Sequence, residues 1–299
     1  MEQNNSNQFQ FPMIQLKNGT KIPQIGFGTY QLKEPDCYNS VLYALQIGYR
    51  HIDTASIYKN EKYIGQAIKD FLQQNKDKGI KRNDLFIVSK INPSEQGYEK
   101  TIQAVQDIIS RLQLEYIDLI LIHWPGVKKF DPSSPDQKEI RQGSWKALNE
   151  LKKQNLVKNI GVSNFLQRHL ESLEELNLEI PAINQFELHP LLLNQQLVDY
   201  CNKKQIQVEA YSSLARQDEK LYKNELMIEI SQKYKKSISQ ICLKWSIQKG
   251  NVVIPKSKTQ KYIAQNLDIF NFQISEEDMQ KINKMDLNFH TCWNPETVY

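Results

Sequence analysis

Residues 49–90 read YRHIDTASIYKNEKYIGQAIKDFLQQNKDKGIKRNDLFIVSK. Short β-rich runs at Tyr49–Asp53 and Leu85–Lys90 predict two strands, and the amphipathic segment Asn60–Gln74 between them predicts a helix. A strand, a helix and a further strand in this order predict a right-handed βαβ unit, in which the two strands run parallel.

The rest of the chain repeats this pattern. Eight strand–helix units over roughly 280 residues match the size of a closed barrel. The predicted fold is therefore α/β, a (β/α)8 or TIM barrel; an open doubly wound sheet has the same periodicity and stays an alternative. The other six strands are expected at Gln24–Gly28, Asp118–Ile122, Val157–Gly161, Ala182–Asn184, Gln207–Ala210 and Val252–Ile254. Further helices are expected at Tyr98–Leu112, Gln142–Gln154, Asn194–Lys204 and Ile238–Lys249.

The segment before the first barrel strand predicts a β-hairpin. Alternating residues in Met13–Ile25 flank Asn18-Gly19, a pair suited to a type I′ turn because both central positions need a positive φ. We expect this hairpin to close the bottom of the barrel. Residues 1–12 are polar at their start and rich in Asn and Gln, which predicts a disordered leader. No linker divides residues 13–299, which are expected to form a single domain.

Composition and charge narrow the class of protein. The net charge is only +4, and the basic residues are scattered, whereas a nucleic-acid binder needs a concentrated basic stripe. No apolar run approaches the roughly 20 residues that span a bilayer, so we expect no membrane partner. The cysteines are far apart and form no C-x-x-C pair, which argues against a zinc site or a disulfide framework and predicts a reducing, cytoplasmic location. They are Cys37, Cys201, Cys242 and Cys292.

Unusual polar residues follow three successive strands. The strand from Tyr49 ends at Asp53, with Tyr58 five residues later; the next ends at Lys90, and the fourth is followed by His123. Burying a Lys head group costs several kcal/mol unless it is paired. Each residue alone has an ordinary explanation, such as a cap or a packing contact. Together at the carboxyl ends of barrel strands, where catalytic residues gather, they predict an active site.

The motifs around these residues resemble the signatures of the aldo-keto reductase family, in order and spacing, from about Met13 to the end of the chain. The first is Gly48-Tyr49-Arg50-His51-Ile52-Asp53-Thr54-Ala55, followed by Tyr58 and Asn60-Glu61. The others are Gly161-Val162-Ser163-Asn164-Phe165, Ile183-Asn184-Gln185-Phe186-Glu187-Leu188-His189-Pro190 and Ile254-Pro255-Lys256-Ser257.

The resemblance implies an NADPH-dependent enzyme that reduces aldehydes and ketones with a tetrad of Asp53, Tyr58, Lys90 and His123. Hydride transfer to a carbonyl leaves an alkoxide, so an acid must deliver a proton, and Tyr58 is the expected donor. Lys90, held charged by Asp53, is expected to lower the pKa of Tyr58. His123 is expected to hydrogen-bond the carbonyl oxygen as a neutral imidazole with a fixed tautomer.

The resemblance also implies how the nicotinamide cofactor binds. Gly26-Phe27-Gly28 lacks the third glycine and the long helix of a Rossmann fingerprint, so it is interpreted as the close-packed first strand. Thr29 and Asp53 are expected near the cofactor. Ser163, Asn164 and Gln185 are expected to bind the carboxamide, Tyr211 to stack on the nicotinamide, and Ser212 and Leu214 to line the pyrophosphate path. Lys256, Ser257 and Thr259 are expected at the 2′-phosphate, and Asn266 at the adenine.

This sequence departs from the family pattern at the cofactor end. Tyr262 stands where many relatives carry an Arg that clamps the 2′-phosphate, and a tyrosine cannot supply a bidentate charged contact. Lys258 replaces an aliphatic residue and is expected to compensate in part, so NADPH is the expected cofactor and NADH is possible. Residues 211–216 lack the usual Pro-Leu-Gly, which predicts a different loop path.

The residues expected to contact the substrate are Tyr30, Trp124, His123 and Tyr58. The loop Gly126–Arg141 is short, and the tail ends soon after Asp286, which favours an open pocket for a small carbonyl compound. Cys292 and Trp293 either reach this pocket or belong to a loose terminus. We expect a monomer.

Two other functions are weighed. One is a catalytically silent cofactor-binding protein with a regulatory or structural role on the same fold, which the intact tetrad disfavours. The other is unrelated barrel chemistry such as phosphate-ester hydrolysis, which would need metal ligands or paired carboxylates at strand ends. The five histidines show no ligand-like spacing, so no metal is expected, and His189-Pro190 is interpreted as a loop-shaping pair.

Overall fold

The computed structural model describes residues 11–127 and 129–299, so most of the predicted leader lies outside the described residues. Eight parallel strands form one sheet in chain order. They are β3 (Phe27–Gly28), β4 (His51–Asp53), β5 (Phe86–Ile91), β6 (Ile117–Ile122), β7 (Val157–Ser163), β8 (Ile183–Glu187), β9 (Gln207–Tyr211) and β10 (Val252–Val253). All eight overlap the predicted strands.

Hydrogen bonds between the two ends of the sheet close the barrel. The Gly26 amide donates to the Val253 carbonyl at 2.8 Å, and the Val253 amide donates to the Gln24 carbonyl at 3.1 Å. Gly28 lets the segments approach, because an added Cβ would lie 2.6 Å from the Ile254 carbonyl oxygen. The (β/α)8 prediction is therefore confirmed, and the open doubly wound sheet is wrong.

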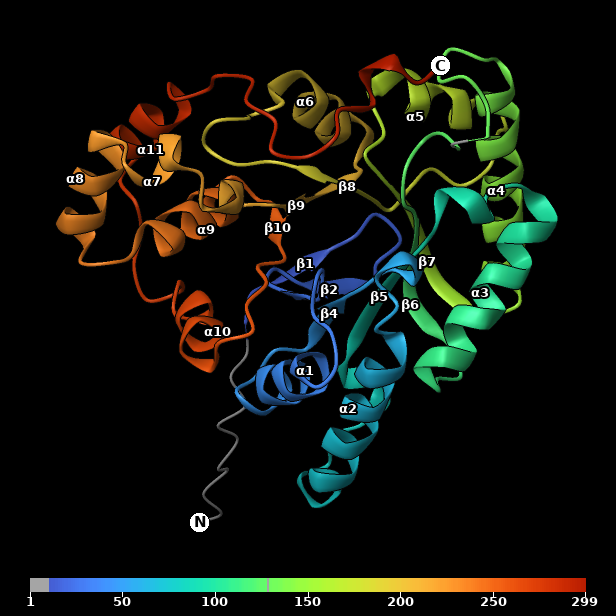
Figure 1. The fold of residues 1–299 in the computed structure, drawn as a ribbon, viewed down its shortest axis with the longest axis horizontal. Helices are drawn as coiled ribbons and strands as arrows, with labels where there is room; N and C mark the ends of the chain where they lie inside the picture. The colour runs from blue at the N-terminus through green and yellow to red at the C-terminus, as the bar shows by residue number, and fades with distance from the viewer. Residues whose placement is uncertain (1–10, 128) are drawn as a thin grey trace.

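Helices surround the barrel (Figure 1). They are α1 (Asp36–Gln46), α2 (Glu61–Gln74), α3 (Tyr98–Leu112), α4 (Asp136–Lys153), α5 (Gln167–Glu174), α6 (Gln195–Lys204), α7 (Glu219–Tyr222), α8 (Glu225–Tyr234), α9 (Ile238–Gln248), α10 (Gln260–Leu267) and α11 (Glu276–Asn283). Helix α4 begins before the predicted Gln142. Its first turn is polar and gives no apolar period, but Asp136 and Glu139 stabilise the helix N-terminus. The loop after β6 is correspondingly shorter than predicted.

Along each strand, alternate residues point into the barrel. These inward residues are apolar near the amino ends of the strands and polar at the carboxyl ends. Along β5, Ile87 packs outward against the helices, whereas Phe86 and Val88 pack inside the barrel. The next inward position is Lys90. Along β6, Leu119 and Leu121 lie inside, and the next inward position is His123. The same strands therefore build an apolar core at their amino ends and the chemical groups at their carboxyl ends.

The predicted hairpin closes the amino end of the barrel. Strands β1 (Met13–Gln15) and β2 (Lys21–Pro23) pair antiparallel, and Leu16 and Ile22 pack against the inward apolar residues of β5, β6, β8 and β10. The predicted type I′ turn is wrong. The turn hydrogen bond joins Gly19 N to Leu16 O, so Lys17 and Asn18 are central and only Gly19 has a positive φ, 87°. A type I turn followed by a left-handed Gly produces this geometry.

Among the described residues, no helix is long and apolar enough to cross a membrane.

Candidate active site

The four tetrad residues lie at the carboxyl edge of neighbouring strands. Asp53 is the last residue of β4, Lys90 is the last but one of β5, and His123 directly follows β6. Tyr58 ends a 3-10 turn, η1 (Ser56–Tyr58), that leads from β4 towards α2. The parallel strands thus bring together side chains that are up to 70 residues apart (123 minus 53).

Lys90 and Asp53 form a fully enclosed ion pair. The Lys90 ammonium donates to both Asp53 carboxylate oxygens at 2.7 Å and to the Thr54 carbonyl at 2.8 Å. Lys90 is 0% exposed and Asp53 is 3% exposed. All three ammonium hydrogens are thereby used, which is the condition under which a buried lysine keeps its charge.

Tyr58 lies above this pair, with Lys90 Nζ 5.4 Å from the centre of its ring and the His123 ring 5.9 Å away. Burial and the nearby Asp53 carboxylate hold the pKa of Tyr58 well above its usual value. The net shift is therefore opposite to the expected lowering, because burial and the Asp53 carboxylate outweigh the Lys90 charge, which Asp53 and Thr54 already bind. Tyr58 is therefore a protonated phenol at neutral pH.

His123 is a neutral imidazole, as predicted. Burial and the Lys90 charge hold the pKa of His123 well below its usual value. The Asn164 amide donates to the His123 carbonyl at 2.9 Å and so fixes its backbone. The His123 Nδ1 atom is enclosed without a hydrogen-bond partner in the described part of the chain, so no described residue fixes the predicted tautomer.

The residues expected at the nicotinamide form one hydrogen-bonded group across β7, β8 and β9. Ser163 Oγ donates to the Gln185 carbonyl at 2.8 Å, and the Tyr211 hydroxyl donates to Asn164 Oδ1 at 2.7 Å. Gln185 Nε2 donates to Asp53 Oδ2 at 2.8 Å and links this group to the ion pair. No hydrogen bond to the side-chain oxygen Gln185 Oε1 is found among the described residues, so this atom is available to accept from a ligand amide.

The residues expected at the adenosine end lie on the segment from β10 into α10. Lys256 and Thr259 are exposed, Ser257 is half-buried, and Asn266 is buried in α10. Thr29, also expected near the cofactor, is buried beside Asp53, and its Oγ1 donates to the Asp53 carbonyl at 2.9 Å. Partial burial and the neighbouring Lys258 lower the pKa of Lys256, so this segment concentrates positive charge.

The loop expected along the pyrophosphate has an unusual backbone. Ser212, Ala215, Arg216 and Gln217 all have positive φ between 46° and 61°. Leu214 is half-buried, and Ser212 Oγ lies 3.5 Å from Cys292 Sγ in the C-terminal tail.

The C-terminal tail reaches the mouth of the site, so the interpretation as a loose terminus is wrong. The Trp293 ring contacts Trp124 edge to face at 4.8 Å, and the Tyr30 ring lies 5.1 Å from Tyr58. Cys292 accepts a hydrogen bond from Arg216 at 3.2 Å. These residues form a rim that is mostly aromatic.

Sequence analysis missed the residues that anchor this tail. The Glu187 carboxylate accepts hydrogen bonds from the amides of Thr291 and Cys292 at 2.9 and 3.1 Å. On α5, Arg168 and His169 both bind the Val298 carbonyl, and the chain ends beside this helix (Figure 1). Glu187 ends β8 and was a visible strand-end signal. His189 contacts Glu187 and bridges to Leu192, as expected of a loop-shaping residue.

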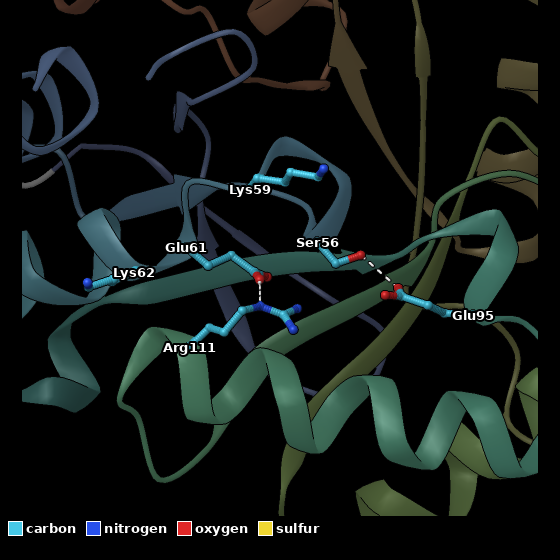
Figure 2. Close-up of a pocket in the computed structure, with 6 residues that line it drawn as sticks. All are labelled: Ser56, Lys59, Glu61, Lys62, Glu95 and Arg111. Atoms are coloured by element: carbon cyan, nitrogen blue, oxygen red, sulfur yellow. Dashed lines mark hydrogen bonds and ion pairs between the residues drawn. The ribbon is translucent and has the colours of Figure 1, made fainter. Parts of the chain in front are cut away.

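A surface cavity of about 330 Å³ lies beside the turn that carries Tyr58 (Figure 2). Inside it, Ser56 donates to Glu95 at 2.7 Å, and Arg111 pairs with Glu61 at 2.5 Å. Because Glu95 also accepts the Asn92 amide, it ties η1 to the loop after β5. These contacts therefore hold the Tyr58 turn from outside the barrel, and the tetrad residues are not among those that line the cavity.

The fold and the site together define an oxidoreductase built on a (β/α)8 barrel. The family model for the aldo/keto reductase family matches residues 24–287, and the chain belongs to this family. The glyoxal reductase of Bacillus subtilis is 41% identical over 287 residues, covering 95% of this chain and 96% of that protein.

Solved structures agree with this assignment. An aldo-keto reductase from a Medee basin deep-sea metagenome library has a TM-score of 0.86 at 41% identity, covering 96% of this chain and 99% of that chain. The aldo-keto reductase of Bombyx mori, determined in complex with NADP, has a TM-score of 0.85 at 31% identity, covering 96% of both chains.

Proposed function

We propose that this oxidoreductase reduces aldehydes and ketones to alcohols with NADPH, and that Tyr58 is the proton donor. The observation that carries the proposal is the enclosed Lys90–Asp53 ion pair, with Tyr58 above it and a neutral His123 beside it. Desolvation of a lysine at the barrel mouth costs several kcal/mol, so a role in the reaction explains its position better than a role in stability.

The residues divide the proton chemistry between them. A reduced nicotinamide supplies the hydride when it is bound. Tyr58 keeps its proton at neutral pH and releases it to the substrate oxygen only as negative charge develops there, because an alkoxide is a far stronger base than a phenolate. As the proton leaves, the phenolate forms next to the Lys90 charge, which stabilises it. His123 orients the carbonyl oxygen.

The described residues fit the cofactor. Tyr211 presents a partly exposed ring at the end of β9, and Gln185 Oε1 is available to a carboxamide amide. Lys256 and Lys258 lie near each other, and among the described residues Lys258 forms a long ion pair with Asp36 at 3.8 Å. A 2′-phosphate would relieve this repulsion, which favours NADPH over NADH. Tyr262 is 52% exposed on α10 and cannot replace a clamping Arg.

The rim supports a small, apolar or aromatic carbonyl compound as substrate. Tyr30, Trp124 and Trp293 supply aromatic ring faces at this rim. The similarity to the Bacillus subtilis glyoxal reductase makes small dicarbonyl compounds the first substrates to test.

The test follows NADPH oxidation with 4-nitrobenzaldehyde and with methylglyoxal. Tyr58→Phe keeps the ring and removes the acid, and we expect turnover to fall about 10²- to 10⁴-fold while NADPH binding persists. Tyr116→Phe is the matched control, because Tyr116 precedes β6 at the opposite end of the barrel. Undiminished turnover in Tyr58→Phe would refute the role of Tyr58. NADPH binding without turnover in the unmodified protein would favour the silent cofactor-binding alternative.

A further inference from the structure

A second carboxyl group lies inside the barrel, outside the predicted tetrad. Glu209 is on β9, paired in register with Gln185 of β8, and is 0% exposed. Gln185 Nε2 donates to Glu209 Oε1 at 2.6 Å and to Asp53 Oδ2 at 2.8 Å. Each of the two amide hydrogens thus goes to a different carboxyl group. Gln185 is held between Asp53 and Glu209.

The charges around Glu209 do not balance if both carboxyl groups are ionised. Lys90 is the enclosed cation near them, and Asp53 already binds its ammonium through both oxygens. On β4, His51 Nε2 lies 4.0 Å from Glu209 Oε2, which is too far for a hydrogen bond. Burial lowers the pKa of His51 to about 3, so this imidazole is neutral. On the other side, β10 places the apolar Val252 in register with Glu209.

The Gly26 backbone keeps His51 against Glu209. A Cβ at position 26 would lie 2.6 Å from His51 Nδ1, so glycine is needed for the imidazole to fit. The Glu209 Oε2 atom is enclosed without a hydrogen-bond partner in the described residues, and the His51 ring interacts with the Pro23 backbone instead. An ionised carboxylate with a bare oxygen in such a place is strongly disfavoured, whereas a carboxylic acid with its proton on Oε2 is tolerated.

We propose that Glu209 is a positioning residue of this reductase: a neutral carboxylic acid that holds the Gln185 amide, and through it Asp53, in the geometry that binds the nicotinamide. The inference rests on the proposed function, because it assigns Gln185 to the carboxamide of the cofactor. Burial and the nearby Asp53 carboxylate raise the pKa of Glu209 to about 8, consistent with a proton retained at neutral pH.

Ionisation of Glu209 at alkaline pH has a defined consequence. Two carboxylates would then face one amide and one ammonium, and their repulsion would displace Gln185 or Asp53. Nicotinamide binding should therefore weaken as the pH rises through about 8. Tyr58 cannot cause this change, because its pKa lies well above the usual tyrosine value and its proton stays in place throughout this range.

The experiment compares the unmodified protein with Glu209→Gln, which keeps the shape and the acceptor oxygen but cannot ionise. Infrared spectra would be recorded at pH 6.5 and 9.5, and NADPH binding would be measured by fluorescence across the same range. We expect a carboxylic-acid band that disappears on raising the pH and is missing in Glu209→Gln. NADPH affinity should fall by about fivefold or more in the unmodified protein and much less in the variant.

The control is Glu61→Gln, a buried glutamate paired with Arg111 and Ser89 outside the barrel interior. It should keep the alkaline loss of affinity. An infrared band insensitive to Glu209→Gln, or an identical loss of affinity in that variant, would overturn the inference. If Glu209→Gln does not fold, spectra of the unmodified protein and of Glu61→Gln, both with ¹³C-labelled glutamate, show whether a glutamic acid other than Glu61 keeps its proton at pH 6.5 and loses it at pH 9.5. These readouts need no turnover, so a failure of the proposed reaction is recognised separately.

Discussion

Replacing Lys90 by methionine tests whether the ion pair at the barrel mouth is as enclosed as its geometry indicates. The substitution keeps the length of the side chain and removes three charged hydrogen bonds, two to Asp53 and one to Thr54. Asp53 is 3% exposed, and of the hydrogen bonds that the described residues make to its carboxylate, the variant would keep the one from the Gln185 amide. Leaving a buried charge unpaired costs about 3–5 kcal/mol, and we expect the free energy of unfolding to fall by that amount at pH 8.

The pH dependence of this loss separates an unpaired charge from a simple packing defect. Without Lys90, the enclosed Asp53 carboxylate has no ammonium partner, and protonation removes this unpaired charge. The loss of stability should therefore be smaller at pH 5 than at pH 8, because protonation of the carboxyl group is less costly at the lower pH. A packing defect would cost the same at pH 5 and at pH 8.

Urea unfolding at both pH values is the assay, with two comparison variants. In Lys90→Met/Asp53→Asn the charge is gone on both sides, so we expect recovery of at least about half of the lost stability. Lys153→Met, at an exposed lysine of α4, should change stability by no more than about 0.5 kcal/mol. A loss below about 1 kcal/mol in Lys90→Met would refute the reasoning, as would a loss independent of pH.

Three further outcomes are expected. Lys256→Ala should weaken NADPH binding about tenfold or more and NADH binding little, measured by fluorescence titration; equal losses would remove Lys256 from the 2′-phosphate. Gly65→Ala should lower stability by about 1–3 kcal/mol in thermal unfolding, because its Cβ would lie 2.2 Å from the Leu112 carbonyl oxygen, whereas Gly143→Ala meets its nearest atom at 3.2 Å and should cost less. Because the pKa of His123 is held well below its usual value, kcat/KM should stay level as the pH falls through 6.5, and a loss there that disappears in His123→Gln would contradict a neutral imidazole.

The barrel and its tetrad were predictable because both depend on local patterns. Strand–helix alternation predicted eight parallel strands, and parallel strands place their carboxyl ends at one edge. Lys90 and His123 are each the first polar inward residue after an apolar stretch, and Asp53 ends the neighbouring strand, so the sequence alone marks these positions. What periodicity could not predict was closure, since it depends on Gly28 leaving room for Ile254 and on the backbone hydrogen bonds between Gly26, Gln24 and Val253.

The properties that sequence analysis missed depend on which groups become enclosed together. The pKa of Tyr58 changes in the direction opposite to the prediction because Asp53 takes up the Lys90 charge, and burial then dominates. The tail was undetermined because Arg168 and His169 bind backbone carbonyls, which any residue at those positions would offer. Glu209 did leave a signal, since a glutamate between Val208 and Ala210 shares the inward side of β9 with Tyr211.

The balance of buried charges inside the barrel restricts which side chains can be ionised there. Asp53 pairs with Lys90, so Glu209, which shares the Gln185 amide with Asp53, is accommodated beside this pair as a neutral acid, the form that burial favours. Burial likewise raises the pKa of Tyr58 and lowers that of His123, which leaves both of these groups neutral beside the ion pair. An active site in this state binds an uncharged carbonyl without opposing charge. It stabilises negative charge only once charge has developed on the substrate oxygen, which is the condition for lowering the barrier and not merely binding the substrate.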